Sequence, residues 1–295
     1  MRLYYCDQYD IPLPTGHRFP MRKYRLLRDV LAADPRFDFA PSPFATAEQI
    51  TLIHDPAYVD AFLNGTLDAA AVRRIGFPWS PNLVSRTLAS VGGTISASHD
   101  ALASGVGGGL AGGTHHAFRS EGSGFCVFND IAVAIEVLRH EGLIRKAAVV
   151  DLDVHQGDGT AAIFQTDPDV LTISVHGRNN FPFRKQVSRL DIELDDGTGD
   201  AQYLAAIEPV FGQVLAFAPD IVFFQSGVDA LSTDKLGRLK LTHDGLRARD
   251  RYVIGHAKEH RLPLVITLGG GYSDPVESTV EAHANTFRTA LVFYG

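Results

Sequence analysis

The sequence has little cysteine and no long apolar run. Only Cys6 and Cys126 occur among its 295 residues, which is too few for a disulfide framework or a thiolate metal site and is typical of a reducing compartment. No run of about 18 apolar residues is present to span a bilayer, and the first residues lack the apolar core of a signal peptide. We therefore expect a cytoplasmic protein.

The sequence also lacks any run of lysines or arginines. Its 27 basic and 34 acidic residues give a formal net charge of -7, and no basic segment marks a face for nucleic acid or anionic lipid. Nucleic acid and membrane are therefore not expected as partners. The oligomeric state is left open.

Apolar segments alternate with helical ones along the chain. With 45% apolar residues, the chain can build one large core, and no shift in composition marks a boundary, so we expect residues 1–295 to form a single domain. The alternation predicts an α/β fold with a mostly parallel central sheet and helices on both faces. Strands are predicted at 2–5, 147–150, 170–176, 220–225 and 262–268.

Apolar residues at helical spacing predict the helices. Asp55 is expected to cap one of them, and Asn129 or Asp130 another. The segment 11–20 contains three prolines and is expected to be a loop. His54, just before the Asp55 cap, is interpreted as structural. The predicted helices are 21–33, 46–53, 56–63, 81–104, 131–140, 161–165 and 202–217.

The stretch 149–159 ends a buried strand with four ionisable side chains. In a continuing strand Asp151, Asp153 and His155 would lie on the same face. Burying two carboxylates and an imidazole together is unfavourable unless a cation lies among them. A helix cap or a plain turn would account for Asp158 but not for the other three. The pattern predicts a metal site with oxygen and nitrogen ligands, suited to Zn²⁺ or Fe²⁺.

A glycine-rich segment at 105–118 carries the adjacent histidines His115 and His116. Glycine lets the backbone approach a site closely. A phosphate-binding loop is the competing interpretation, but no Lys-Ser/Thr pair follows the glycines, and the spacing of a nucleotide fingerprint is not met. By itself the histidine pair is ambiguous, because exposed pairs are common.

Two further strand ends carry polar side chains. Asp229 follows the strand at 220–225, and Tyr272 follows three glycines after the strand at 262–268. In a parallel α/β sheet the carboxyl ends of the strands line one crevice. We therefore expect Asp229 to complete the ligand set and Tyr272 to lie beside the open metal position. A tyrosine that only packs in the core is the alternative for Tyr272.

Taken together, these segments resemble the zinc-dependent histone deacetylase superfamily, which has the arginase-deacetylase fold. The resemblance covers nearly the whole chain. It is strongest to the class IV branch, through PLP (12–14) ahead of HRFPM (17–21), HQG (155–157) and DKLGRL (234–239). The segments that carry the resemblance to the superfamily are GGTHHA (112–117), GFC (124–126), DLDVHQGDG (151–159), GVD (227–229) and GGGY (269–272).

The resemblance implies that Asp153, His155 and Asp229 hold the metal, Zn²⁺ or alternatively Fe²⁺. A water molecule and the amide carbonyl of the substrate would share the remaining coordination positions. The ion would activate that water near neutral pH and polarise the carbonyl.

The resemblance also implies how the reaction is catalysed. His116 would act as general base and then as general acid, with Asp158 as its carboxylate partner. His115, paired with Asp151, would stay protonated as electrostatic support. Tyr272 would donate a hydrogen bond to the oxyanion, a contribution of roughly 3 kcal/mol for one donor.

A third implication concerns the substrate. Phe125 and Phe181 would wall a narrow tunnel for the lysine stem, with Phe183 as an alternative to Phe181. The Gly124 carbonyl would accept the substrate amide N–H, and Gly270 is also assigned to substrate binding.

The superfamily carries K⁺ sites built from backbone carbonyls. The residues that match the outer of two such sites are at 164, 167 and 170. The residues that match the inner site are Asp151, Asp153, His155, Ser174 and Val175.

These implications define the functional hypotheses. The first is a metal-dependent amidohydrolase that removes acetyl or longer acyl groups from lysine side chains of proteins or from related acyl-amines. The alternatives are an acetylpolyamine or other small-molecule amidohydrolase, a binuclear ureohydrolase, and a non-catalytic acyl-amine binding protein.

Overall fold

One eight-stranded sheet runs through the chain, and every neighbouring pair of its strands is parallel. The computed structural model describes residues 1–295. The strands are β1 (Arg2–Tyr5), β2 (Asp38–Pro41), β3 (Val106–Gly109), β4 (Ala147–Asp151), β5 (Val170–Gly177), β6 (Leu190–Leu194), β7 (Ile221–Gln225) and β8 (Leu264–Thr267). Their order is β2-β1-β3-β8-β7-β4-β5-β6. The predicted α/β fold class is confirmed.

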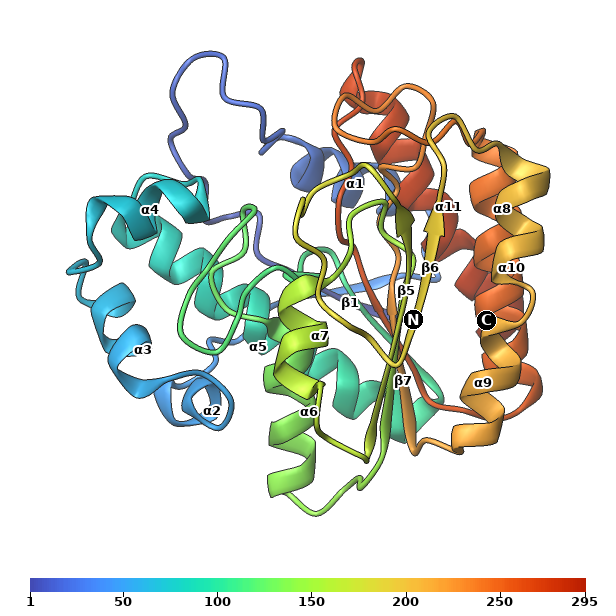
Figure 1. Cartoon of the computed structure of the whole chain (residues 1–295), viewed down its shortest axis with the longest axis horizontal. Coiled ribbons are helices and arrows are strands. Elements are labelled where there is room, and N and C mark those ends of the chain that lie inside the picture. Colours follow the sequence, from blue (N-terminus) through green and yellow to red (C-terminus); the bar gives the residue numbers. More distant parts are fainter.

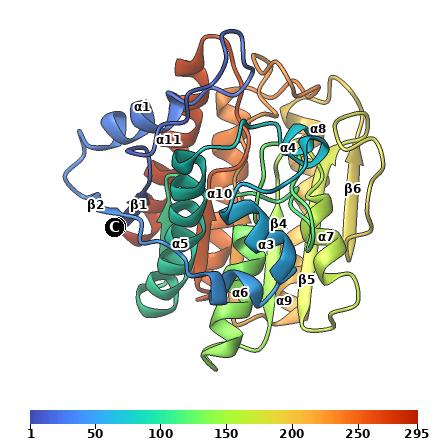
Figure 2. The ribbon, with the colours of Figure 1, turned by 90° about the vertical axis from the view of Figure 1, so that its left-hand side faces the viewer.

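Helices cover both faces of this sheet. They are α1 (Lys23–Leu31), α2 (Ala47–Thr51), α3 (Pro56–Leu63), α4 (Ala69–Ile75), α5 (Pro81–Ser104), α6 (Asp130–His140), α7 (Asp158–Phe164), α8 (Asp200–Ile207), α9 (Val210–Phe217), α10 (His243–Glu259) and α11 (Val276–Tyr294). Helices α5, α6 and α7 lie on one face and α8 to α11 on the other (Figure 1). Figure 2 shows the first face, with α3, α5 and α6 in front of the sheet.

The central strands are buried on both faces because each face has its own core. In β7, Phe223 packs into the core on the α5 and α6 side, and Phe224 packs into the core on the α10 and α11 side. This two-sided burial is why these strands appear in the sequence as continuous apolar runs rather than as alternating ones. No helix is both long enough and apolar enough to cross a membrane.

Several helix boundaries match the sequence prediction because the capping residues determine them. Helices α3 and α5 have the predicted bounds, and each begins with proline at its first position. The Asp55 carboxylate accepts a hydrogen bond from the Ala57 N–H at 2.8 Å. Asn129, rather than Asp130, caps α6 by accepting from Ala132 at 3.0 Å. His54 is structural as expected, with its ring between the Arg119 carbonyl and the Asn129 N–H.

The prediction of one helix at 202–217 is wrong. The chain forms α8 and α9 instead, with Pro209 at the N-terminal boundary of α9. Proline has no N–H to donate to the preceding turn, so a continuous helix would lose a hydrogen bond there. Strands β2, β3 and β6 and helices α4, α10 and α11 were not predicted. Strand β3 lacks β-branched side chains after Val106, because a Cβ at Gly107 would collide with the Ala97 carbonyl of α5.

The expected continuation of a strand through residue 155 is also wrong. Strand β4 ends at Asp151, and the next residues form a loop. In that loop each aspartate accepts a hydrogen bond from the backbone two residues ahead: the Asp153 N–H donates to Asp151 at 3.1 Å, and the His155 N–H donates to Asp153 at 3.0 Å. These turns, not strand alternation, bring the three side chains together.

Helix α10 ties the turn after β7 to the core through a buried cation. Arg249 is 0% exposed and pairs with Asp250 at 2.8 Å. Its guanidinium also donates to the carbonyls of Ser226 and Gly227. The Thr286 hydroxyl donates to the second oxygen of Asp250 at 2.7 Å. The backbone just before Asp229 is therefore fixed by a charged group that has no access to water.

We predict that Arg249→Met lowers the free energy of unfolding by about 3–5 kcal/mol, because it leaves the buried Asp250 carboxylate without its partner. Urea unfolding measures the change. Arg247→Met is the matched control, since Arg247 pairs with Asp244 at the surface of the same helix and should change stability by only about 0–1 kcal/mol. Equal stability of the two variants would contradict this role for Arg249.

Candidate metal centre and active site

Three buried side chains converge at the carboxyl edge of the sheet. Asp153, His155 and Asp229 place one ligand atom each within 4.8 Å of one another. The His155 Nδ1 lies 3.1 Å from Asp153 Oδ1 and 3.0 Å from Asp229 Oδ2. They come from the loops that follow β4 and β7, which are neighbours in the sheet. The structure thus brings together the residues that the sequence predicted as one ligand set.

The surrounding backbone orients both carboxylates. The Gly270 N–H donates to Asp153 Oδ2 at 2.7 Å, and the Val154 N–H donates to Asp229 Oδ1 at 2.9 Å. A Cβ at Gly270 would collide with the Asp229 carboxylate, so glycine is required there. Gly270, predicted to bind substrate, therefore contacts the ligand set directly.

The electrostatics of this cluster fit a cation. Burial alone would lower the pKa of His155, but its hydrogen bonds to Asp153 and Asp229 outweigh burial and raise the pKa to about 10. Burial, and then the charge of Asp153, raises the pKa of Asp229 to about 7. A single proton on His155 is thus shared between two buried carboxylates. One nitrogen and two oxygen ligands, with an excess of negative charge, suit a divalent ion such as Zn²⁺ or Fe²⁺.

Next to this cluster, each of the adjacent histidines has its own aspartate. His115 Nδ1 lies 2.7 Å from Asp151, and His116 Nδ1 lies 2.6 Å from Asp158. Both imidazoles are buried, with ring centroids 4.1 Å apart. The His116 ring lies 5.9 Å from the His155 ring. The pairing predicted from the resemblance is present in the structure.

The two histidines of this pair are driven to opposite protonation states. Burial opposes the charge on His115, but the charges of Asp151 and Asp153 outweigh it and raise its pKa to about 9. Burial, and then the positive charge of His115, lowers the pKa of His116 to about 4 in spite of Asp158. His115 is therefore protonated and His116 neutral at pH 7.

Asp130 holds the glycine-rich loop that carries the two histidines. It accepts hydrogen bonds from the backbone of Gly113 at 3.0 Å and of Thr114 at 2.7 Å, and from the hydroxyls of Thr94 and Thr114. From the sequence, Asp130 was expected only as a possible helix cap. Its contacts reach across 16 to 36 residues, so no local pattern could have revealed this role.

Tyr272 is half-buried and lies near the Asp229 and Asp153 carboxylates. Burial, and then the charges of Asp229 and Asp153, raises the pKa of its phenol well above the usual value, so the hydroxyl stays protonated and can donate. Its backbone N–H donates to Asp234 Oδ2 at 2.6 Å. The buried Lys23 ammonium lies 5.2 Å from the centre of the Tyr272 ring. No pattern in the sequence indicated a positioning role for Asp234 or Lys23.

Aromatic side chains surround the approach to the site. The Phe125 ring lies 5.2 Å from Phe19 and 6.2 Å from Tyr272. The Phe181 ring lies 4.9 Å from the His116 ring, whereas Phe183 is 86% exposed. Of the two candidate phenylalanines in that loop, Phe181 is therefore the one beside the site.

Gly124 lies close to both the base and this wall. A Cβ at Gly124 would approach His116 Cδ2 to 2.7 Å and Phe181 to 3.2 Å. The residue also has a positive φ of 54°, which glycine adopts without strain. The substrate-binding candidates Gly124, Phe125 and Phe181 thus lie around the histidine pair and Tyr272.

The predicted K⁺ positions differ in their surroundings. At the inner site, Asp151 lies opposite Ser174 in the register of β4 and β5, with Val175 next to it, so these residues are neighbours. At the outer site, the Phe164 carbonyl accepts from the Asp167 N–H, and the Asp167 carbonyl accepts from Arg189. Two of the three outer carbonyls, those of Phe164 and Asp167, therefore already accept hydrogen bonds. The inner K⁺ site stays a prediction.

Comparison with known proteins identifies the class to which this fold and site belong. Residues 17–287 match the histone deacetylase domain. The chain therefore belongs to the histone deacetylase family, as the sequence motifs indicated.

Two relatives and one solved structure show how far the likeness extends. An uncharacterised protein of Picosynechococcus is 43% identical, with 98% of each chain covered. The histone deacetylase-like amidohydrolase of Pseudomonas aeruginosa is 31% identical over 89% of this chain and 74% of its own. The crystal structure of the HDA15 HD domain has the same fold, with a TM-score of 0.81 and 22% identity over 99% of this chain and 91% of that one. Assignment to the class IV branch stays a prediction.

We predict that Asp234→Asn lowers turnover of an acylated amide substrate by about 10–100-fold, since small misplacements of a reacting group have effects of this size. The remaining carbonyl oxygen of the asparagine would still accept from the N–H groups of Leu236 and Gly237. Its NH₂ group would face the Tyr272 N–H and could not accept that hydrogen bond. Turnover and bound metal should be measured together. The exposed Asp244→Asn is the control. Loss of metal in step with loss of turnover would contradict a role for Asp234 in positioning Tyr272.

Proposed function

We propose that this chain is a metal-dependent amidohydrolase that removes acetyl or longer acyl groups from the ε-amine of lysine or from a related acyl-amine. We also propose that residues 1–295 form one catalytic domain. The observation that carries the proposal is the position of the His116–Asp158 pair beside the Asp153, His155 and Asp229 cluster. Membership of the histone deacetylase family supports amide hydrolysis as the reaction class.

In this proposal Asp153, His155 and Asp229 hold Zn²⁺, with Fe²⁺ as the alternative. When bound, the ion lowers the pKa of a coordinated water and polarises the acyl carbonyl. As a ligand, the His155 imidazole would have to be neutral, because a ligating nitrogen needs its lone pair.

His116 is the proposed proton carrier, and Asp158 determines which of its nitrogens acts. A carboxylate can only accept, so the Nδ1 of His116, 2.6 Å from Asp158, carries the hydrogen. The Nε2 of a neutral ring is then the acceptor. It takes a proton from the attacking water and returns it to the departing amine. The positive charge of His115 lowers the pKa of His116 and so favours transfer of this proton to the departing amine.

Tyr272 is the proposed hydrogen-bond donor to the oxygen that becomes negative as the carbonyl is attacked. Such a donor contributes roughly 3 kcal/mol to the stabilisation of the transition state. Phe125 and Phe181 are the proposed walls for the aliphatic stem of lysine. The Gly124 carbonyl is the proposed acceptor for the substrate amide N–H. The apolar stem and the polar amide would thus each meet matching groups.

A cavity of about 50 Å³ lies next to Phe125, one of the proposed walls for the lysine stem. Its walls include Phe19, Phe77, Val127 and Phe128, with Arg86 among its polar residues.

A binuclear ureohydrolase has less support in the structure. Two metal ions would require further carboxylates to bridge them. The neighbouring carboxylates Asp151 and Asp158 are each engaged by a histidine. A metal content near one ion per chain would exclude this alternative.

We predict that His116→Ala lowers turnover by about 10²–10⁴-fold, the usual contribution of general acid-base catalysis, while the metal is retained. Asp229→Ala should lose the metal first, because it removes a ligand. Metal content after dialysis and turnover of an acetyl-lysine peptide separate the two effects, and each variant serves as the control for the other. The assignment fails if His116→Ala alone releases the metal.

We further predict that wild-type protein with Zn²⁺ or Fe²⁺ releases product from at least one member of a series of acyl groups, acetyl through long fatty acyl, on a lysine peptide or a polyamine. Tyr272→Phe removes only the hydroxyl and should lower kcat by about 10²-fold. No turnover on any member would contradict the proposed function. Equal activity of Tyr272→Phe and wild type would show that the turnover does not come from this site.

A further inference from the structure

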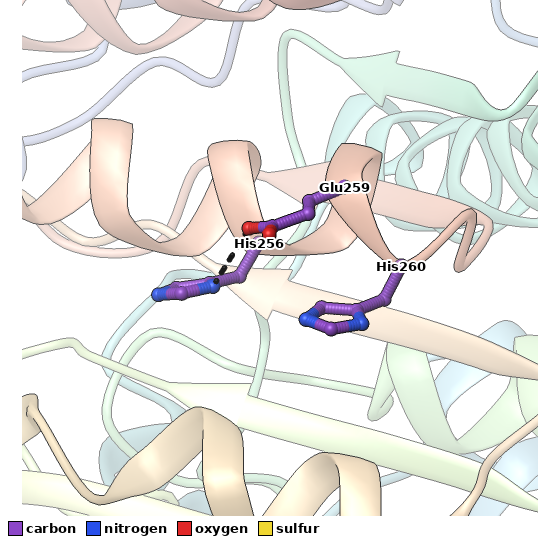
Figure 3. Close-up of side chains that lie close together, drawn as sticks. All are labelled: His256, Glu259 and His260. Carbon is purple, nitrogen blue, oxygen red and sulfur yellow. Dashed lines mark ion pairs between the residues drawn. The ribbon is translucent and has the colours of Figure 1, made fainter.

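A second group of metal-ligating side chains lies at the end of α10, outside the site described above. His256 and Glu259 belong to the last turn of the helix, and His260 follows it directly. Figure 3 shows the two imidazoles on the same side of the helix end, with the Glu259 carboxylate turned toward His256. None of the three takes part in the proposed reaction.

The three side chains are close enough to share one ion. Each offers a ligand atom, and these atoms lie within 4.8 Å of one another. His256 Nδ1 lies 3.6 Å from Glu259 Oε2, too far for a hydrogen bond, and has no other partner although the atom is buried. Two histidines four residues apart lie on one face of a helix, a spacing that binds zinc elsewhere.

Packing against Phe211 of α9 and Tyr252 of α10 holds His256 in place. Its ring stacks on Phe211 at 5.2 Å and lies 4.7 Å from the Tyr252 ring. The Tyr252 hydroxyl donates to the Glu208 carbonyl and accepts from the Phe211 N–H. Because the ring is already fixed, little side-chain entropy would be lost when an ion binds.

The local electrostatics favour a cation. The C-terminal end of a helix carries a partial negative charge from its unpaired carbonyls, and Glu259 adds a full one. Basic side chains are also nearby: Arg251 and Lys258 line the same pocket as His256 and Glu259, and Arg261 follows His260. The Lys258 ammonium lies 4.6 Å from the centre of the Tyr294 ring, a contact with α11.

This cluster lies at the opposite edge of the sheet from the catalytic residues. Residues 260–263 lead from α10 into the first residue of β8, whereas the proposed metal ligands and Tyr272 follow the last residues of β4, β7 and β8. The two sites are therefore separated by the length of the strands.

We propose that His256, Glu259 and His260 form a second metal site for a divalent transition-metal ion such as Zn²⁺ or Ni²⁺, with its remaining coordination positions open to water. Two imidazoles and one carboxylate are ligands that such ions prefer. The ion joins the last turn of α10 to the residue that follows it, and so stabilises the turn that enters β8. Its effect is on stability and not on the reaction.

The test uses enzyme whose catalytic site already holds one equivalent of Zn²⁺. Titration with further Zn²⁺, followed by calorimetry, should show one more equivalent bound to the wild type. His260→Gln should weaken this second binding by at least ~10-fold. Even the loss of a residue that only hydrogen-bonds to a metal ligand weakens metal binding by ~10–100-fold. His140→Gln is the matched control, because His140 is a single exposed histidine at the end of α6, and it should leave the second equivalent intact.

A second readout checks the proposed role. Added Zn²⁺ should raise the unfolding temperature of wild type and of His140→Gln, but not that of His260→Gln, because only a native state that binds the ion gains stability. Turnover by all three proteins should be the same. The proposal is overturned if wild type binds no second equivalent, or if His260→Gln binds it as tightly as wild type does.

Discussion

The structure depends on the confinement of several negative charges at one edge of a parallel sheet. Asp151, Asp153, Asp158 and Asp229 are all buried there, in a place where isolated carboxylates would be strongly destabilising. Each is compensated in a specific way, by an imidazole or by backbone N–H groups or by both. The shortage of positive charge in this cluster is what suits it to a cation. Glycines surround it because side chains at Gly227 and Gly270 would collide with the carboxylates.

The same confinement makes two adjacent histidines chemically different. His115 is stabilised as a cation by Asp151 and Asp153, and its charge then disfavours a second cation on His116. The difference comes from their neighbours rather than from the residues themselves. Outside the cluster, Asp130 and Asp234 fix the loops that carry the histidines and Tyr272, so the chemistry relies on hydrogen bonds between segments that are far apart in sequence.

Much of the fold was predictable because its signals are local. The bounds of α3 and α5 followed from a cap residue and a proline at the first helical position. The four central strands were recognisable from apolar runs. The split between α8 and α9 and the loop after β4 were missed although their causes, Pro209 and the hydrogen bonds to Asp151 and Asp153, are local. The glycine-rich β3 was missed because its glycines are required by contact with α5. The three predicted ligands do lie together, although the strand alternation invoked for them does not occur.

By itself, the sequence indicated which residues are candidates for the chemistry, since aspartates, histidines and a tyrosine at strand ends are recognisable from residue type and order. It also determined the family, through motifs that the comparison confirmed. Only the tertiary structure decided that Phe181 rather than Phe183 lies beside His116. It also decided that Asp234 accepts a hydrogen bond from the Tyr272 N–H. The grouping of His256, Glu259 and His260 in a second cluster is likewise seen only in the tertiary structure. The physical reason is that distances between side chains are decided by packing of the whole chain, whereas residue type and spacing are properties of each segment alone.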